Sequence, residues 1–212
     1  MKTAQENTEI ITNEDIEVIE FTNIEALEQL YGKFSPQLFV AWGKLYKASL
    51  FNDITYPYGR IHEDDFTTYK VLYKAKKTVL TTEKLLYYWQ RSDSIMGSGF
   101  KPKNVLDLLD AYEERAIFLH ENNLTDLLSE TYKSIFFIYI RIYLELYKFL
   151  PVISKEEFVD RFTDFKVQLR ASKQSNSFKL TYELFSSFPI LFKGVYKLIH
   201  LFKVDRLLMG MH

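Results

Sequence analysis

The pattern of apolar and polar residues changes character at Pro102. Before it, short apolar runs are separated by turns, and Ile16, Val18 and Phe21 predict a short strand. After it, apolar residues recur at helical spacing, with breaks at 122–123, 151–154, 172–177 and Pro189. The pattern predicts an α+β, mostly helical chain with a polar N-terminal remnant over 1–15, a mixed region over 16–100 and a helical region over 101–212.

Three helices are expected in the mixed region. Asn23 is positioned to cap a brief helix over 24–31. Ser35 followed by Pro36 opens a helix predicted to run to about Phe51, with Trp42 on its apolar face. The third begins near Glu63 and continues through Phe66, Tyr69, Leu72 and Tyr73, which recur at helical spacing.

Two short β-type runs follow the third helix. Residues 77–81 and 85–90 are rich in β-branched or aromatic side chains and are separated by a polar turn at 82–84. This arrangement predicts a two-stranded hairpin. Gly97, Ser98 and Gly99 then form a flexible loop before the helical region.

Four ionisable side chains in a row, His62, Glu63, Asp64 and Asp65, enter the third helix from a turn. A helix N-terminus favours carboxylates, because its unpaired N–H groups and the positive end of its dipole lie there. A carboxylate held at the edge of a cleft can equally serve as a general base. The residues themselves leave both interpretations open.

The composition limits the classes of function. A formal net charge of -1 argues against a nucleic-acid-binding protein. The chain has no cysteine, which excludes disulfides and thiolate metal sites and favours a reducing, cytoplasmic setting. No signal peptide is apparent, and the apolar runs are too short to span a membrane. Nor does His62–Asp65 have the histidine spacing of a helical metal site, so we expect no metal there.

The last segment, residues 188–211, combines helical apolar spacing with Lys193, Lys197 and Lys203 on another side. A basic amphipathic helix of this kind can lie on an anionic membrane surface. Packing or dimerisation with solvated lysines is the alternative. The first interpretation would place the protein peripherally at the inner face of the cell membrane.

Three stretches in order, AWGKLYKASLF (Ala41–Phe51), YPYGRIHEDDFTTYKVLYKAKK (Tyr56–Lys77) and LLYYWQRSDSIM (Leu85–Met96), together resemble a known family. They are similar to the C-terminal half of the catalytic domain of bacterial family 2 glycosyltransferases of GT-A type, which build surface polysaccharides or glycosylate surface proteins. The resemblance implies that residues 16–100 form the acceptor-side half of such a domain, including the hairpin, and that the helical region is an appendage.

The resemblance also implies roles for individual residues. Asp64 matches the catalytic base, which takes the proton from an acceptor hydroxyl during an inverting transfer. Glu63 and His62 would orient the acceptor or tune the base, and Asp65 would cap the helix. Trp42 would lie under the acceptor sugar, although core packing accounts for its position equally well.

Donor binding is implied to involve Gln90, Arg91 and Ser94, which match a loop near the nucleotide diphosphate in the family. An arginine suits phosphate oxygens, but an Arg that closes an exposed hairpin is commonly just solvated.

One departure from the family concerns the donor. The sequence contains no Asp-x-Asp motif and no recognisable nucleotide-binding half. Complete members use Mg²⁺ or Mn²⁺ with a nucleotide-sugar donor, so we expect no cofactor in this chain and no activity when it is alone.

Expected partners are an acceptor glycan or glycolipid and an intact or complementary glycosyltransferase chain. The alternative is a non-catalytic helical interaction module, or a subunit that pairs with an intact glycosyltransferase.

Overall fold

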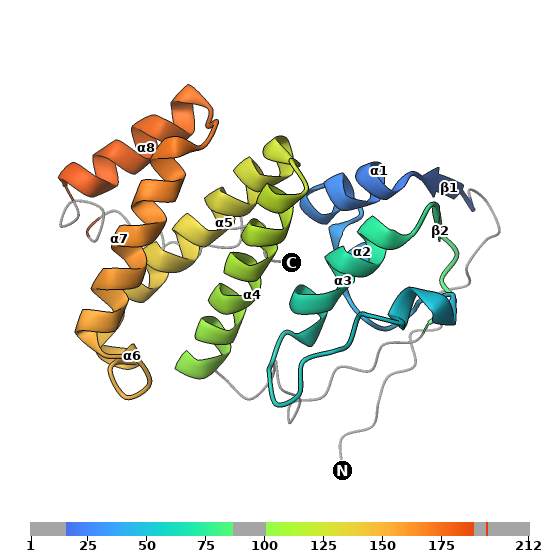
Figure 1. Ribbon diagram of the computed structural model, residues 1–212, viewed down its shortest axis with the longest axis horizontal. Helices are drawn as coiled ribbons and strands as arrows, with labels where there is room; N and C mark the ends of the chain where they lie inside the picture. The colour runs from blue at the N-terminus through green and yellow to red at the C-terminus, as the bar shows by residue number, and fades with distance from the viewer. Residues whose placement is uncertain (1–15, 87–100, 189–193, 195–212) are drawn as a thin grey trace, which may run out of the picture.

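A computed structural model describes residues 16–86, 101–188 and 194 of the protein (Figure 1). The mixed region contains β1 (Val18–Phe21), α1 (Asn23–Glu28), the 3-10 helix η1 (Gln29–Tyr31), α2 (Ser35–Phe39), the 3-10 helix η2 (Ala48–Phe51), α3 (Glu63–Lys74) and β2 (Thr78–Thr81). The helical region contains α4 (Pro102–Glu121), α5 (Thr125–Leu144), α6 (Leu146–Phe149), α7 (Lys155–Ala171) and α8 (Asn176–Ser187). A mostly helical α+β chain is confirmed.

The two strands pair with each other in antiparallel register, from Val18 opposite Thr81 to Phe21 opposite Thr78. The expected partner of β2 was the run at 85–90, and that prediction is wrong for the described residues. Leu85 and Leu86 are not in a strand, and the rest of the run lies outside the described residues. Pairing with β1 buries Phe21 and places it in the main core, which the local hairpin pattern could not reveal.

Helix α1 is capped one residue earlier than expected. Thr22 has an extended backbone, and its hydroxyl accepts from the Glu25 N–H while the Glu25 carboxylate accepts from the Thr22 N–H. This reciprocal pair is a capping box. Asn23 instead donates from its side-chain amide to the Tyr73 carbonyl, 3.1 Å away, so it ties α1 to the end of α3.

The helix predicted over Ser35–Phe51 is also wrong, because α2 ends at Phe39. Val40 is extended, with φ -63° and ψ 148°, and Gly43 has a left-handed φ of 69°. The Thr68 hydroxyl of α3 donates to the Phe39 carbonyl at 2.9 Å. That contact satisfies a carbonyl at the helix end, and residues 40–47 continue as an irregular segment.

Helix α3 begins at the predicted residue, and the predicted breaks at 122–123, 151–154 and 172–177 each coincide with a helix end, whereas the division between α5 and α6 at Glu145 was not predicted. Figure 1 shows α4 between α3 on one side and α5 and α7 on the other. The apolar core is continuous across these elements, from Leu27 and Tyr69 through Leu109 to Tyr139 and Phe185. The helical region therefore shares one core with the mixed region.

None of the described helices is both long enough and apolar enough to cross a membrane. The predicted amphipathic segment at 188–211 lies outside the described residues, apart from Phe188 and Gly194. Its membrane role stays a prediction.

Candidate functional site

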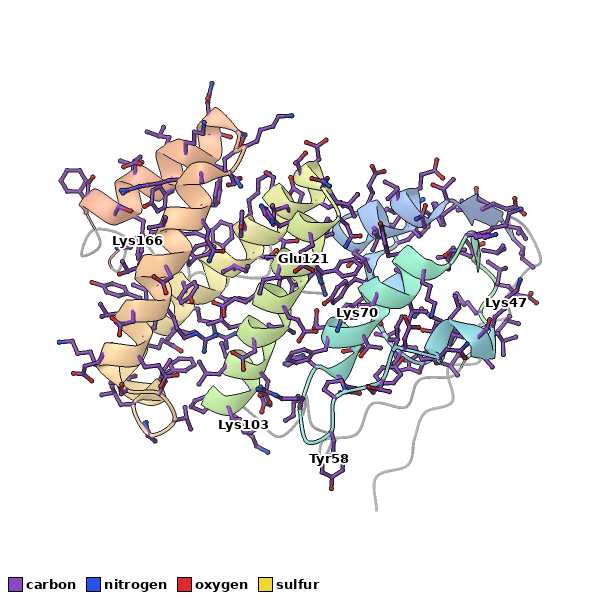
Figure 2. All side chains as sticks on the ribbon, viewed as in Figure 1. Lys47, Tyr58, Lys70, Lys103, Glu121 and Lys166 are labelled. Atoms are coloured by element: carbon purple, nitrogen blue, oxygen red, sulfur yellow. The ribbon has the colours of Figure 1, made fainter. Side chains whose placement is uncertain are left out.

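The segment that leads into α3 makes two left-handed backbone turns. Gly59 has a φ of 74°, and Tyr58 before it projects fully into solvent (Figure 2). His62, the N-cap residue of α3, has φ 64° and ψ 39°. A non-glycine residue in such a conformation costs on the order of 1–3 kcal/mol and is found most often where the surroundings fix it for function.

Asp64 lies in the first turn of α3 and is partly buried. Its Oδ1 accepts a hydrogen bond of 3.1 Å from the Asp65 N–H. Burial raises the pKa of Asp64, and the nearby Glu63 charge raises it further, against the opposing effect of backbone hydrogen bonds and His62. A carboxylate whose pKa moves towards the working pH is a more effective general base.

His62 is partly buried beside these acids. Burial lowers its pKa, although Asp64, Asp107 and Glu63 act in the opposite direction. Its Nδ1 lies 3.7 Å from Oδ2 of Asp65. Burial thus favours the neutral imidazole, in which one nitrogen can donate and the other can accept.

The irregular segment 40–47 places further titratable groups near Asp64. Burial lowers the pKa of Lys44 to about 8, while Asp64 acts to raise it. Burial raises the pKa of Tyr46, as do Tyr56 and Asp64. Sequence reasoning missed Lys44 and Tyr46 because it placed them on a helix. Gly43 between Trp42 and Lys44 was the available signal.

Trp42 lies on the same irregular segment, with 49% of its surface exposed. It is therefore not a core residue, which was one of the two interpretations of its spacing. Gln90, Arg91 and Ser94 lie outside the described residues. Their contact with a donor stays a prediction.

Asp65 does not cap α3, which corrects the sequence prediction. Its carboxylate is buried and accepts a 2.9 Å hydrogen bond from Nη2 of Arg115 in α4, which also donates to the Asp65 carbonyl at 3.2 Å. Both side chains are nearly inaccessible to solvent. The guanidinium carbon lies 5.2 Å from the ring centre of Tyr69 and 4.5 Å from that of Tyr112.

The two partners of this buried pair differ in their electrostatics. Burial raises the pKa of Asp65, although Arg115 acts to lower it. Burial acts to lower the pKa of Arg115, but Tyr31, Tyr112 and Asp65 outweigh it and raise that pKa. The guanidinium is thus charged throughout the accessible pH range, and we place the ionised carboxylate beside it at neutral pH because their separation is that of a charge-assisted hydrogen bond.

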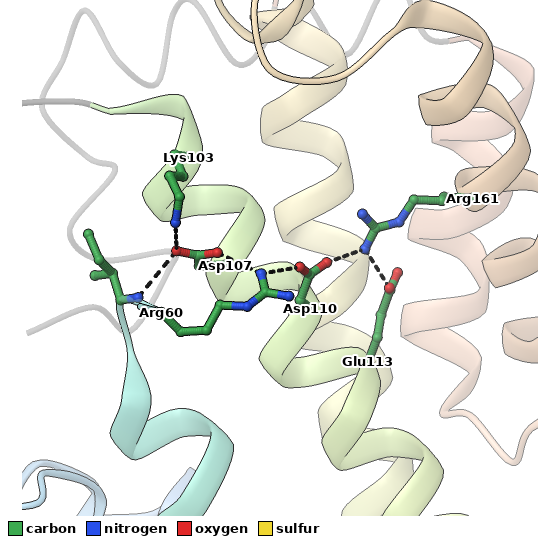
Figure 3. Close-up of polar contacts among 7 residues, drawn as sticks. Arg60, Lys103, Asp107, Asp110, Glu113 and Arg161 are labelled. Carbon is green, nitrogen blue, oxygen red and sulfur yellow. Dashed lines mark hydrogen bonds and ion pairs between the residues drawn. The ribbon is translucent and has the colours of Figure 1, made fainter. Parts of the chain in front are cut away.

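A second contact with α4 lies just before His62. Oδ2 of Asp107 accepts from the Ile61 N–H at 3.2 Å and from Lys103 at 2.7 Å, and its Oδ1 accepts from Arg60 at 2.7 Å (Figure 3). Burial acts to raise the pKa of Asp107, but these three donors together hold it below its usual range. A buried carboxylate with three donors is well satisfied.

The segment His62–Asp64 is consequently held at both ends by one helix. Asp107 and Arg115 lie eight residues apart on α4, or about 12 Å along its axis, with buried Ala111 between them. These two contacts, from Asp107 to the Ile61 N–H and from Arg115 to Asp65, form a clamp on the backbone that carries Asp64. The Asp64 carboxylate itself takes part in none of the ion pairs that the structure describes.

Among the described residues, no group of three His, Asp or Glu side chains is arranged to hold a metal ion. The Asp65 carboxylate accepts from Arg115, and the Asp64 carboxylate accepts from a backbone N–H. The acidic side chains at the start of α3 therefore do not converge on one point. A cofactor requirement is not tested by this arrangement and stays a prediction.

The chain is similar to two glycosyltransferases of Streptococcus pneumoniae serotype 4. It is 31% identical to glycosyltransferase GlyA over 102 residues, which are 47% of this chain and 14% of GlyA. It is 29% identical to glycosyltransferase GlyG over 108 residues, which are 50% of this chain and 36% of GlyG. No family model matches the chain, and no solved structure matches it. The similarity supports a glycosyltransferase-like protein, and the aligned part spans only a minor share of each relative.

Proposed function

We propose that this chain supplies the acceptor side of an inverting glycosyltransferase of family 2 and GT-A type, with Asp64 as its general base. The observation that carries the proposal is a partly buried carboxylate of raised pKa, in a segment that α4 holds at both ends, in a chain similar to two glycosyltransferases. A base must be positioned first and tuned second. The contacts from α4 support the first condition for Asp64, and its raised pKa supports the second.

In the proposed reaction, the oxygen of an acceptor hydroxyl attacks the anomeric carbon of the donor sugar. The bond from that carbon to the nucleotide diphosphate breaks, so the configuration inverts, and Asp64 receives the hydroxyl proton. Glu63 raises the pKa of Asp64, and the neutral imidazole of His62 can hold an acceptor hydroxyl. The exposed ring of Trp42 offers an apolar face to the acceptor sugar.

Donor binding in this proposal needs a nucleotide sugar and Mg²⁺ or Mn²⁺, held by residues that these 212 do not include. Gln90, Arg91 and Ser94 would contact the diphosphate once those residues are present. We therefore expect the chain to be inactive by itself, to work in the cytoplasm with a complementary glycosyltransferase chain, and to act on a glycan or a glycolipid at the inner membrane face.

The test is saturation-transfer NMR of the purified chain with a panel of mono- and disaccharides, and separately with nucleotide sugars and Mn²⁺. We expect contact with a saccharide, its loss in Trp42→Ala, and its retention in Asp64→Asn. Tight nucleotide-sugar binding would contradict the missing donor site. If Trp42→Ala binds every saccharide as the wild type does, the acceptor site lies elsewhere.

A second candidate is a non-catalytic interaction module. The continuous core and the buried Asp65–Arg115 pair favour it, because they allow the chain to fold as a stable unit with no chemistry. This candidate predicts no saccharide contact and a stable complex with an intact glycosyltransferase on size-exclusion chromatography.

A further inference from the structure

A line of alternating charges joins the candidate site to helix α7, which lies on the far side of α4. Nη1 of Arg60 donates to Asp107 and to Oδ2 of Asp110, each at 2.7 Å. The other oxygen of Asp110 accepts from Nη2 of Arg161 at 2.7 Å. Figure 3 shows the carboxylate of Asp110 between the two arginines.

The α7 end of this line is anchored. Nη2 of Arg161 also donates to Oε2 of Glu113 at 2.6 Å, and the buried Tyr139 hydroxyl donates to Oε1 of Glu113 at 2.5 Å. Burial acts to lower the pKa of Arg161, but Glu113 and Asp110 outweigh it and raise that pKa. The ring of Tyr139 stacks on Phe165 of α7, with centres 5.1 Å apart.

We propose that Arg161 is a positioning residue for the candidate base, acting through Asp110 and Arg60. Arg161 fixes one oxygen of Asp110, which leaves the other directed at Arg60. Arg60 in turn begins the short backbone run to His62 and Asp64. The helical region thereby sets the placement of Asp64 without touching it. The inference rests on the proposed function only in taking Asp64 as the base.

The charges along the line balance. Asp107, Asp110 and Glu113 face Arg60, Lys103 and Arg161. Loss of Arg161 leaves Arg60 as the partner of Asp110. It also removes the positive charge that Asp110 and Glu113 share. Arg60 is partly exposed to solvent, and its Nη1 is held by Asp107 and Asp110 together, so a loosened Asp110 removes one of the two contacts that order it.

The experiment is amide hydrogen exchange by NMR on the full chain, for wild type, Arg161→Met, Arg60→Met and the double variant. We expect Arg161→Met to speed exchange at the Ile61 and Asp65 amides about three- to ten-fold relative to buried α5 amides. In the Arg60→Met background the same change should add less than about two-fold, because the line is already broken.

Two further variants separate positioning from general destabilisation. Lys166→Met removes a positive charge from the same helix (Figure 2) and should leave both amides unchanged. Arg161→Lys keeps one cation that can reach Asp110 and should restore most of the protection. The pH titration of the His62 imidazole, assigned with His62→Gln, should shift in Arg161→Met and return in Arg161→Lys.

The proposal is overturned if Arg161→Met leaves the Ile61 and Asp65 amides at wild-type rates while α7 exchanges faster. It is also overturned if the effect is as large in the Arg60→Met background as in the wild type. Amide hydrogen exchange is measured without a nucleotide-sugar donor or an acceptor sugar, so this result is independent of whether the chain takes part in sugar transfer.

Discussion

The candidate site and the helix that holds it are built in opposite ways. Residues 40–62 run mostly as irregular backbone, with exposed aromatic side chains at Trp42 and Tyr58 and a left-handed His62. Helix α4 is regular over 20 residues and inserts buried Leu109 and Ala111 into the core. The irregular part and the first turn of α3 carry the groups suited to chemistry, and α4 carries the charges that fix them.

This comparison shows where the stability of the site comes from. The local sequence of 61–65 does not fix its own geometry, because its ends are held by Asp107 and Arg115 from a helix more than 40 positions away. An active-site segment that is fixed by a rigid element keeps its shape without regular hydrogen bonding of its own. Variants that loosen the clamp should therefore affect the site before they affect the helices.

The largest effect is expected for Arg115→Met. It leaves the Asp65 carboxylate buried without a counter-charge, which typically costs about 3–5 kcal/mol of unfolding free energy. Urea unfolding followed by circular dichroism measures it. Arg170→Met, at an exposed arginine of α7, is the matched control and should change stability by less than about 1 kcal/mol.

Adding Asp65→Asn to Arg115→Met removes the stranded charge and should recover a large part of the loss. If the double variant is as unstable as the sum of the two single variants, Asp65 and Arg115 do not act as a pair.

A middle-sized effect is expected at the helix caps, where the two regions should behave alike. Thr22→Ala and Ser154→Ala each remove a side-chain acceptor at a helix N-terminus, from α1 and α7 respectively. We expect each to cost about 1 kcal/mol, measured by urea unfolding, with exposed Thr55→Ala near zero. A cost confined to one region would show that the caps depend on their surroundings rather than on the local hydrogen bond.

The last effect concerns pH and belongs to the irregular part. The pKa of Lys44 is about 8 in the folded chain, below the usual lysine value of about 10.4. Between these values the unfolded chain binds more protons, so the contribution of Lys44 to stability rises with pH and is complete above the unfolded value. Lys44→Met should flatten that rise in thermal melts from pH 7.5 to 10.5, whereas exposed Lys47→Met should not.

The sequence predicted most of the described helices after Pro102 because their apolar spacing and breaks reflect local propensity, although the break at Glu145 between α5 and α6 was missed. Helix α3 was predicted for the same reason. The end of α2 at Phe39 was not, since a hydroxyl from α3 satisfies its last carbonyl. Asp65 was predicted to cap α3 because a helix N-terminus favours acidic residues, but its carboxylate is buried and accepts a hydrogen bond from Arg115. Each of these errors comes from a contact between residues that are distant in sequence, and the spacing of apolar and polar residues does not reveal such contacts.

The candidate site shows the same difference between what the local sequence indicates and what contacts between distant residues determine. Asp64, Glu63 and His62 could be proposed from the sequence because they are adjacent and because Glu63 and Asp64 resemble the Glu-Asp pair of family 2 glycosyltransferases, and their roles stay predictions. Lys44 and Tyr46 were missed because only the bend at Gly43 brings them towards Asp64.

The most direct test of the central claim is the pH titration of the Asp64 side-chain carboxyl carbon by NMR in the intact chain. If the clamped, partly buried setting tunes Asp64 as a base, its pKa lies above the ordinary aspartate value of about 3.9 and falls part of the way back in Glu63→Gln. A pKa at or below that value, unchanged in Glu63→Gln, would contradict the account.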